Sequence, residues 1–135
     1  MPSLRRDFTF LFTDIERSSH LWEQHPQTMG RALAQHDDLM RAALKEHRGT
    51  IFKTVGDAFC TVFHSALDAM RAAVLAQQQL AAAAWGETGP LKVRMALHSG
   101  EAEERDGDYF GQTLNRVARV LAAGHGGQTL LSRVT

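Results

Sequence analysis

Two aspartates stand where their position in the sequence allows either a structural or a chemical role. Asp14 lies one alternating step beyond a phenylalanine stripe at residues 8, 10 and 12, and a carboxylate there is costly unless it has a partner. Asp57 follows Gly56 between two strand-like runs, where aspartate is also an ordinary turn residue. Asp14 is therefore either a helix cap or a metal ligand, and Asp57 is either a turn residue or a metal ligand.

The two carboxylates would converge if the strands that flank Asp57 lie beside the strand that ends at Asp14. Two convergent carboxylates repel each other unless a cation lies between them. Hard oxygen ligands with open coordination positions suit Mg²⁺ or Mn²⁺ ions that carry substrate phosphates. We therefore predict a phosphate-handling, divalent metal site at Asp14 and Asp57.

Three further polar residues interrupt apolar patterns. Lys53 is expected to share a strand face with Ile51 and Val55, where it either extends to water or reads a ligand. Asn115 and Arg119 are four residues apart on an expected helix, so they share one face. That face is either a solvated flank or a pair of donors for one anionic or ribose-bearing ligand.

The order of expected elements predicts an α+β fold with helices on one face of a mainly antiparallel sheet. Alternation predicts strands at residues 8–13, 51–55, 58–63, 91–98 and 128–131. Helical spacing predicts a helix from about residue 20 that is interrupted at Pro26 and stops at Gly49, a helix capped by Ser65 that runs to about residue 84, and a helix at 113–123 with Leu114, Val117, Ala118 and Leu121 buried. Residues 101–108 are charged and are expected to be turn-like around Asp106 and Gly107.

Bulk composition excludes several classes of protein. The 135 residues are 44% hydrophobic and 22% charged, which predicts one ordered domain over residues 1–135. Lys+Arg and Asp+Glu both total 15, so no net charge attracts nucleic acid or an anionic membrane. No apolar stretch predicts membrane insertion, and residues 1–7 lack the apolar core of a signal peptide. The single cysteine, Cys60, fits a cytoplasmic location.

Three runs of sequence resemble motifs of class III nucleotidyl cyclases, in order and across nearly the whole chain. The first is Phe-Thr-Asp-Ile-Glu at residues 12–16, followed by Ser18. The second is Lys-Thr-Val-Gly-Asp-Ala-Phe at 53–59, and the third runs from Asp108 through Asn115 to Arg119. One such run is weak evidence, whereas three in order are strong. The resemblance implies the fold of that family, a ferredoxin-like or palm-type antiparallel sheet covered by helices.

The resemblance also implies roles for the matching residues. Asp14 and Asp57 would hold two Mg²⁺ or Mn²⁺ ions, assisted by the carbonyl of Ile15. Lys53 and Asp108 would read the purine, and this pair is the one found in adenylate cyclases, whereas guanylate cyclases typically have glutamate and cysteine there. A donor opposite N1 and an acceptor opposite the 6-amino group are complementary to adenine.

By the same resemblance, Asn115 would orient the ribose and Arg119 would stabilise charge on the phosphates in the transition state. Ser18 and Ser19 would contribute to substrate binding. The expected reaction is conversion of ATP to 3′,5′-cyclic AMP and pyrophosphate, assisted by two metal ions, in intracellular signalling. Sites of this family form between two subunits, and this chain carries both sets of residues, so a homodimer with two sites is expected.

Two departures from the family pattern favour an alternative function. Arg17 stands where the family usually has glycine, and it either obstructs the approach of the triphosphate or adds a phosphate contact. The chain stops at Thr135, whereas family domains are expected to continue through another helix and a final strand hairpin. The alternative is a catalytically silent nucleotide-binding or dimerisation module of a larger signalling regulator.

A metal phosphohydrolase is a second rival, suggested by the adjacent His36 and Asp37. The pair alone is weak evidence, because no second histidine–aspartate set has fitting spacing.

Overall fold

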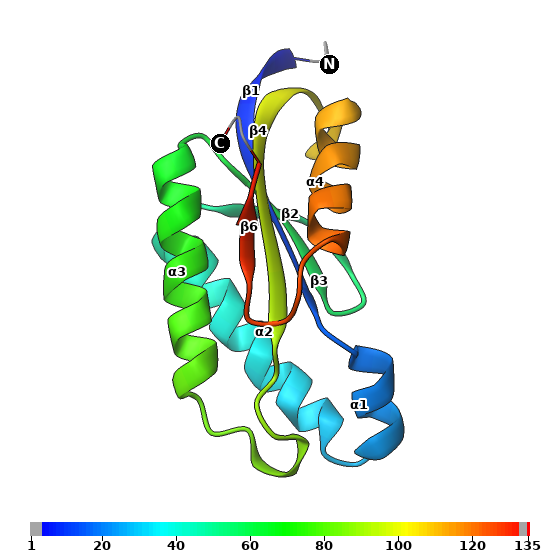
Figure 1. Ribbon diagram of the computed structural model, residues 1–135. Helices are drawn as coiled ribbons and strands as arrows, with labels where there is room; N and C mark the ends of the chain where they lie inside the picture. The colour runs from blue at the N-terminus through cyan, green and yellow to red at the C-terminus, as the bar shows by residue number, and fades with distance from the viewer. Residues whose placement is uncertain (1–3, 133–134) are drawn as a thin grey trace.

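β1 (Leu4–Ile15) is the central strand of a curled sheet. This computed structural model describes residues 4–132 and 135. Residues 1–3, part of the segment predicted to lack the apolar core of a signal peptide, lie outside the described residues. The strand order is β2-β3-β1-β4-β5, and β6 lies parallel beside β4 (Figure 1). The other elements are α1 (Ser18–Gln24), α2 (Met29–Glu46), β2 (Thr50–Val55), β3 (Ala58–Phe63), α3 (Ala66–Ala82), the 3₁₀ turn η1 (Gly86–Thr88), β4 (Val93–Arg105), β5 (Asp108–Phe110), α4 (Gln112–Ala122) and β6 (Thr129–Leu131).

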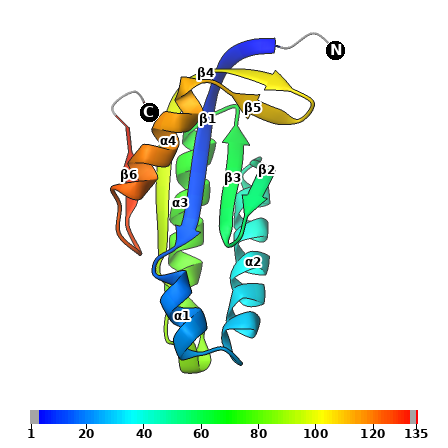
Figure 2. The ribbon, with the colours of Figure 1, turned by 90° about the vertical axis from the view of Figure 1, so that its right-hand side faces the viewer.

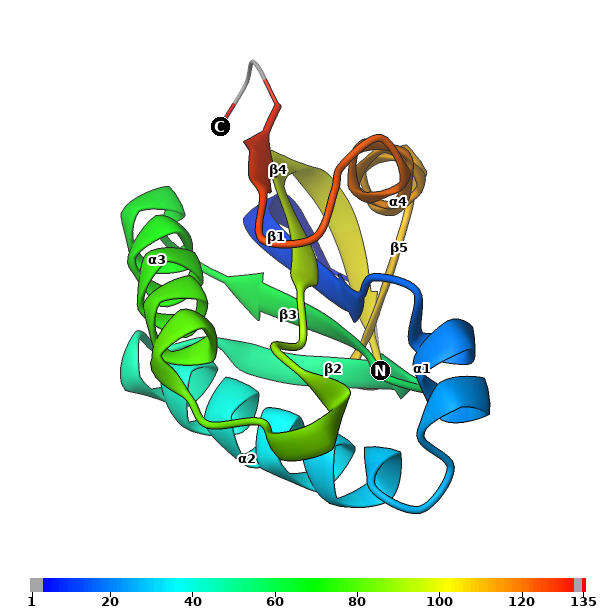
Figure 3. The same ribbon diagram turned by 60° about the horizontal axis from the view of Figure 1, so that its bottom comes forward.

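Helices cover both faces of the sheet, not one face as predicted. α2 and α3 pack on the face that carries Leu11, Phe63 and Leu97, which are all fully buried. α4 packs on the opposite face, where its buried Val117 meets Phe10. Figure 3 shows α2 and α3 on one side of the strands and α4 on the other. The alternating phenylalanines of β1 needed a cover of their own, and α4 supplies part of it.

The sheet curls until its two outermost strands meet on the α4 face. β2 and β5 stand at opposite ends of the strand order, yet the rings of Phe52 and Tyr109 lie 4.7 Å apart between their centroids. Phe10 lies between these strands, 6.0 Å from Phe52 and 5.6 Å from Tyr109. Figure 2 shows the β4–β5 hairpin bending over toward β2 and β3. An aromatic core therefore closes this face without a further helix.

A β-bulge in β2 reverses the expected orientation of one candidate residue. Ile51 lies opposite Thr61 and Lys53 lies opposite Cys60, with a register shift between the two pairs. Because directly opposed residues share a face, Lys53 lies on the face of Cys60 and not on that of Ile51. The prediction that Lys53 and Ile51 share a face was wrong, because the bulge adds Phe52 to one strand only and breaks the alternation.

The fourth strand is longer than its sequence pattern indicated. β4 runs to Arg105, so residues 101–105 of the expected turn-like stretch are strand. The turn itself lies at Asp106 and Gly107, as predicted, with φ of 53° and 76°. The charged residues of this stretch pair with the start of β1, where Glu104 meets Arg6 at 3.5 Å. Charged side chains that face solvent do not interrupt the ladder, and this part of β4 pairs with β1 on one side and β5 on the other. Composition alone therefore suggested a turn where the chain forms a strand.

Local signals placed the helix ends well. α1 ends at Gln24 and α2 begins at Met29, so the predicted break at Pro26 is confirmed. The hydroxyl of Ser65 accepts the backbone N–H of Asp68 at 3.2 Å, which confirms the predicted cap of α3.

α2 ends in a Schellman motif one residue before the predicted stop. Arg48 adopts the left-handed conformation with φ of 67°, and the backbone N–H groups of Arg48 and Gly49 donate to the carbonyls of Lys45 and Leu44. Gly49 is needed for space instead. A Cβ there would lie 2.6 Å from Cζ of Phe63 and 2.9 Å from the carbonyl oxygen of Leu44.

We expect Gly49→Ala to lower the free energy of unfolding by about 1–3 kcal/mol, because the added methyl group overpacks the Phe63 site. Gly30→Ala is the matched control, because Gly30 is an exposed position of α2 whose Cβ would find its nearest neighbour, in Trp22, at 4.0 Å. The control should raise the free energy of unfolding by up to about 1 kcal/mol. Urea denaturation of both variants measures the difference, and equal effects would contradict the steric explanation.

Candidate functional site

Asp14 forms a two-pronged ion pair with Arg94. The strands bring them together, because Asp14 near the end of β1 lies opposite Arg94 near the start of β4. Arg94 donates from Nε to Oδ1 of Asp14 at 2.7 Å and from Nη2 to Oδ2. The side chains are 21% exposed for Asp14 and 26% for Arg94, so the pair is partly withdrawn from water. Both carboxylate oxygens of the predicted metal ligand are thus engaged by one guanidinium.

Asp57 lies within the electrostatic environment of the same guanidinium. The hydrogen bond to Asp14 is the largest cause that raises the pKa of Arg94, and the charges of Glu16 and Asp57 act in the same direction, against the opposing effect of burial. The topology explains this proximity. β3 lies beside β1, and Gly56 and Asp57 form the two-residue tip between Val55 and Ala58, as predicted. Arg94 therefore contacts Asp14 directly, and the charges of Glu16 and Asp57 also act on it.

The donor set at this end of the sheet fits a divalent cation that arrives with phosphates. Within the described part of the chain, no group of three or more histidine, cysteine, aspartate or glutamate side chains is arranged to hold a metal ion. Magnesium sites on nucleotides commonly use only one or two carboxylates, with phosphates and water supplying the other ligands. Asp14 and Asp57 supply that number of carboxylates, and Arg94 engages Asp14 in this structure. The role of these residues as metal ligands stays a prediction.

Lys53 and Asp108 form a second ion pair on the α4 face. Nζ of Lys53 lies 3.1 Å from Oδ2 of Asp108, and the side chains are 47% and 30% exposed. Cys60 is half-buried beside them. Burial raises the pKa of its thiol most, and the charge of Asp108 adds to this while that of Lys53 opposes it. The two predicted purine readers are thus brought together by the curl of the sheet.

The aromatic core supports this second pair. Tyr109 follows Asp108 in β5, and its ring packs edge-on against Phe8 at 5.1 Å as well as against Phe52. Burial raises the pKa of Tyr109 to about 12, and its hydroxyl donates to Glu104 at 3.2 Å. The backbone N–H of Tyr109 also donates to the Asp108 carboxylate at 2.8 Å. Asp108 is therefore held in place by its own strand as well as by Lys53.

The remaining predicted site residues occupy separate places. Ile15 is the buried last residue of β1, and Ser18 and Ser19 open α1 directly below the Asp14 end. Asn115 and Arg119 are exposed on α4, whereas Val117, which lies between them in the sequence, is buried. Ala118 is also exposed, so its predicted place in that stripe was wrong. The Asp14–Arg94 and Lys53–Asp108 pairs form without Asn115 or Arg119.

Arg17 takes a backbone conformation that favours glycine. It precedes α1 with φ of 58° and ψ of 37°, in the left-handed region, and its side chain makes no capping hydrogen bond. The side chain is exposed, and with Glu16, His20 and Lys92 it borders a hollow of about 170 Å³. The left-handed turn is one that glycine adopts without a steric penalty, so Arg17 adopts it at a cost.

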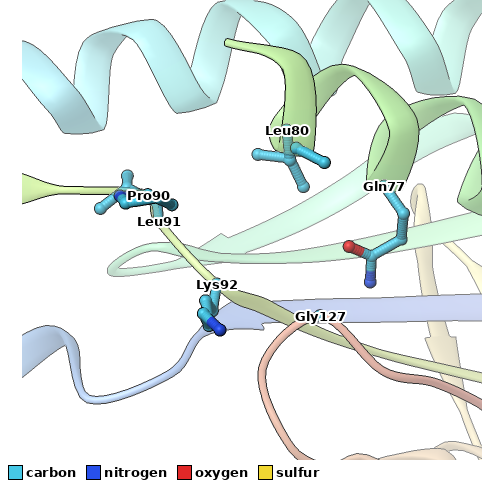
Figure 4. Close-up of a pocket in the computed structure, with 7 residues that line it drawn as sticks. Gln77, Leu80, Pro90, Leu91, Lys92 and Gly127 are labelled. Atoms are coloured by element: carbon cyan, nitrogen blue, oxygen red, sulfur yellow. The ribbon is translucent and has the colours of Figure 1, made fainter. Parts of the chain in front are cut away.

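A larger cavity of about 360 Å³ lies away from the predicted site residues. Leu80 and Gln77 of α3 border it on one side, and Pro90, Leu91 and Lys92 border it on the other (Figure 4). Gln77 also donates to the carbonyl of Val93 at 3.1 Å, which ties α3 to the start of β4. The candidate residues instead lie on open surface at a sheet end and on the α4 face.

Only the histidine of the rival hydrolase pair is part of the core, because the side chain of Asp37 is 38% exposed. His36 is fully buried in α2, its Nδ1 lies 2.8 Å from Oδ1 of Asp37, and its ring packs against Phe59 at 5.8 Å. No metal-binding cluster includes it among the described residues. The geometry therefore favours a packing role.

None of the helices in the described part of the chain combines the length and apolarity needed to cross a bilayer.

The protein-family model of the adenylate and guanylate cyclase catalytic domain matches residues 3–135. The chain belongs to this family. The solved structure of a Trypanosoma brucei adenylate cyclase in its monomeric state superposes with a TM-score of 0.88 at 26% identity, over 95% of this chain and 74% of that one. The predicted cyclase fold is thereby confirmed.

Curated relatives agree with this assignment. An uncharacterized protein of Mycobacterium tuberculosis is 37% identical over 129 residues, which is 94% of this chain and 43% of that protein. An adenylate cyclase of Neurospora crassa is 32% identical in a 157-residue alignment that covers 98% of this chain and 7% of that protein. The cyclase chain thus spans less than half the length of these relatives.

Sequence reasoning missed Arg94, although a signal was present. Arg94 interrupts the apolar run from Val93 to Leu97, as Asp14 interrupts the end of the phenylalanine stripe. The rule that singled out Asp14 would have found its partner too, since a charge within a buried strand needs a counter-charge.

We expect Arg17→Gly to raise the free energy of unfolding by up to about 1 kcal/mol, because removing a left-handed cost of about 1–2 kcal/mol outweighs the greater backbone entropy that glycine loses. Arg17→Ala is the matched control, because it removes the charge but keeps the unfavourable conformation, and it should change stability by less than about 0.5 kcal/mol. Thermal and urea unfolding measure both. A loss of stability in the glycine variant would mean that the arginine side chain makes stabilising contacts.

Proposed function

We propose that this domain converts ATP to 3′,5′-cyclic AMP and pyrophosphate at sites formed between two copies of the chain. The observation that carries the proposal is the Lys53–Asp108 pair, a donor and an acceptor 3.1 Å apart on an open face. Membership of the cyclase family supplies the reaction class. The relative from N. crassa, which is named an adenylate cyclase, supports the choice of nucleotide.

The order of donor and acceptor along the purine edge favours adenine. Adenine offers an acceptor at N1 and a donor at its 6-amino group, so Lys53 would face N1 and Asp108 would face the amino group. Guanine has an acceptor at position 6 and a donor at N1, so Lys53 and Asp108 would have to exchange places to read it. The backbone hydrogen bond that holds Asp108 at 2.8 Å opposes such an exchange.

The other residues divide the remaining work. Asp14, Asp57 and the Ile15 carbonyl would hold two Mg²⁺ or Mn²⁺ ions, which when bound would activate the ribose 3′-hydroxyl and offset phosphate charge. Ser18 and Ser19 lie at the adjoining turn, where they would contact the phosphates. Asn115 would orient the ribose, and Arg119 would offset the charge that develops on the phosphates.

A homodimer would bring the two sets of residues together. Asn115 and Arg119 are exposed on α4, and the apolar Val55 and Phe110 are 64% and 39% exposed near the hairpin tip and on β5. An interface would bury apolar side chains of this kind and place Arg119 of one copy against the carboxylates of the other. Two equivalent sites would result from a symmetric pair.

A catalytically silent nucleotide-binding or dimerisation module is the second candidate. The specific observation in its favour is that Arg94 engages both oxygens of Asp14, the place a metal ion would occupy. Arg17, which stands in the adjoining turn where the family usually has glycine, also favours a silent module. Formation of cyclic AMP by the dimeric protein separates the two candidates, because a silent module would bind the nucleotide and release no product.

We expect the dimeric protein to release cyclic AMP from ATP with Mn²⁺ or Mg²⁺, and Asp57→Ala to reduce this turnover more than about 100-fold, because one of the two proposed carboxylate ligands is lost. Asp38→Ala, on the exposed side of α2, removes the same charge far from the site and should leave turnover unchanged. Product is measured by chromatography, and sedimentation checks that Asp57→Ala still dimerises. No product from the dimeric wild type would refute the enzyme, and full activity of Asp57→Ala would refute the metal assignment.

We expect the double variant Lys53→Glu/Asp108→Cys to lower the ratio of ATP to GTP turnover at least about tenfold, because the hydrogen-bonding pattern offered to the purine is changed. Lys53→Glu alone is expected to weaken the preference for ATP as well, while placing a second carboxylate against Asp108. The double variant removes that repulsion. Competition between ATP and GTP in one assay measures the ratio, and an unaltered ratio would count against purine reading by this pair.

A further inference from the structure

We propose that Arg94 is a resident counter-cation that keeps free divalent metal ions away from Asp14 until a nucleotide enters the site. This inference rests on the proposed function of Asp14 and Asp57 as metal ligands. It adds a residue outside the predicted site, and it assigns an order to the arrival of ligands. The order is that a metal ion enters with the nucleotide and not before it.

The geometry of the pair carries the first part of the argument. Arg94 donates to both oxygens of Asp14, one of these contacts being 2.7 Å long, so the carboxylate has lost the lone-pair directions that face the guanidinium. A carboxylate that serves two ions needs both oxygens. With the side chains only 21% and 26% exposed, water screens the pair less than it would at a free surface. A metal ion must therefore compete with a fitted guanidinium, not with water alone.

The surrounding charges carry the second part. Arg94 contacts Asp14, and Thr13 lies opposite Phe59, so the tip that carries Asp57 is at the same end of the sheet. The charge of Arg94 therefore offsets part of the attraction that these carboxylates would exert on a free cation. A nucleotide changes this balance because its phosphates offer the guanidinium another anionic partner with fitting geometry. The same phosphates supply further oxygen ligands for the metal ion. Exchange of partners by Arg94 would then free Asp14 at the moment when the ion arrives.

A purely structural role for the pair is the competing explanation. Registration of β1 on β4 does not need it, because the two strands pair continuously from Leu4 opposite Glu104 to Ile15 opposite Val93. Apolar burial on both faces adds to this, since Leu11 and its partner Leu97 are fully buried on one face and Phe10 is fully buried on the other. The ion pair lies at one end of a strand pairing that backbone hydrogen bonds and apolar burial already stabilise.

The test is a titration of the chain with Mn²⁺ alone, followed by the electron paramagnetic resonance signal of the free ion. We expect weak binding by the wild type and binding at least about tenfold tighter by Arg94→Gln, because a bidentate charged contact no longer competes. Arg94→Lys keeps the charge without the fork and should fall between them. Arg71→Gln, on the exposed side of α3, removes the same charge elsewhere and should match the wild type.

Two further arms assign the result. Asp14→Asn in the Arg94→Gln background should abolish the gain, which places the additional Mn²⁺ at Asp14. Equilibrium dialysis with α,β-methylene-ATP should show Mn²⁺ retained by the wild type at concentrations where Mn²⁺ alone does not bind. Thermal unfolding checks that each variant is folded. If Arg94→Gln does not fold, Arg94→Lys is compared with the wild type instead.

Three outcomes would overturn the inference. Equal Mn²⁺ binding by wild type and both Arg94 variants, with nucleotide-dependent binding intact, refutes the counter-cation and leaves the proposed function standing. Tight binding of Mn²⁺ alone by the wild type refutes the order of arrival. Absence of Mn²⁺ binding in every variant, even with α,β-methylene-ATP, refutes the metal site and with it both proposals.

Discussion

The pairing of β1 with its two neighbours is the constraint on which this cyclase domain depends. β1 runs antiparallel to β3 and β4, and its apolar residues are buried on both faces, as Phe10 and Leu11 illustrate. A one-residue slip would exchange the two faces, so burial fixes the register strongly. That register sets Asp14 opposite Arg94 and brings the tip at Asp57 to the same end of the sheet.

Curling of the sheet creates the second half of the candidate site. Lys53 in β2 and Asp108 in β5 stand on strands at opposite ends of the strand order, and they meet because those strands bend toward each other over an aromatic core. The bulge at Phe52 contributes twice. It adds a ring to that core, and it turns Lys53 to the face where Asp108 lies. The same bulge therefore contributes both to the packing of the aromatic core and to the positioning of Lys53 against Asp108.

The two ion pairs of the candidate site differ in the contacts that a ligand must supply to replace them. The Lys53–Asp108 pair is open, with Lys53 47% exposed, so under the proposed function both groups would exchange their mutual contact for a purine edge at little cost. The Asp14–Arg94 pair is more enclosed and uses both carboxylate oxygens, so a ligand must supply a replacement partner for the guanidinium. A nucleotide with its phosphates and metal ions brings groups suited to both pairs.

Residue types and local spacing by themselves determined most of the elements, the turn at Gly56 and Asp57 and the cap at Ser65, because alternation, turns and caps act over a few residues. The resemblance of three motifs in the sequence pointed to the family. Local spacing misplaced the orientation of Lys53 and the cover of the phenylalanine face. Only the tertiary structure decided that Asp14 meets Arg94 and that Lys53 meets Asp108. Strand register and sheet curl set those contacts, and both arise from twist and burial summed over strands that are distant in sequence.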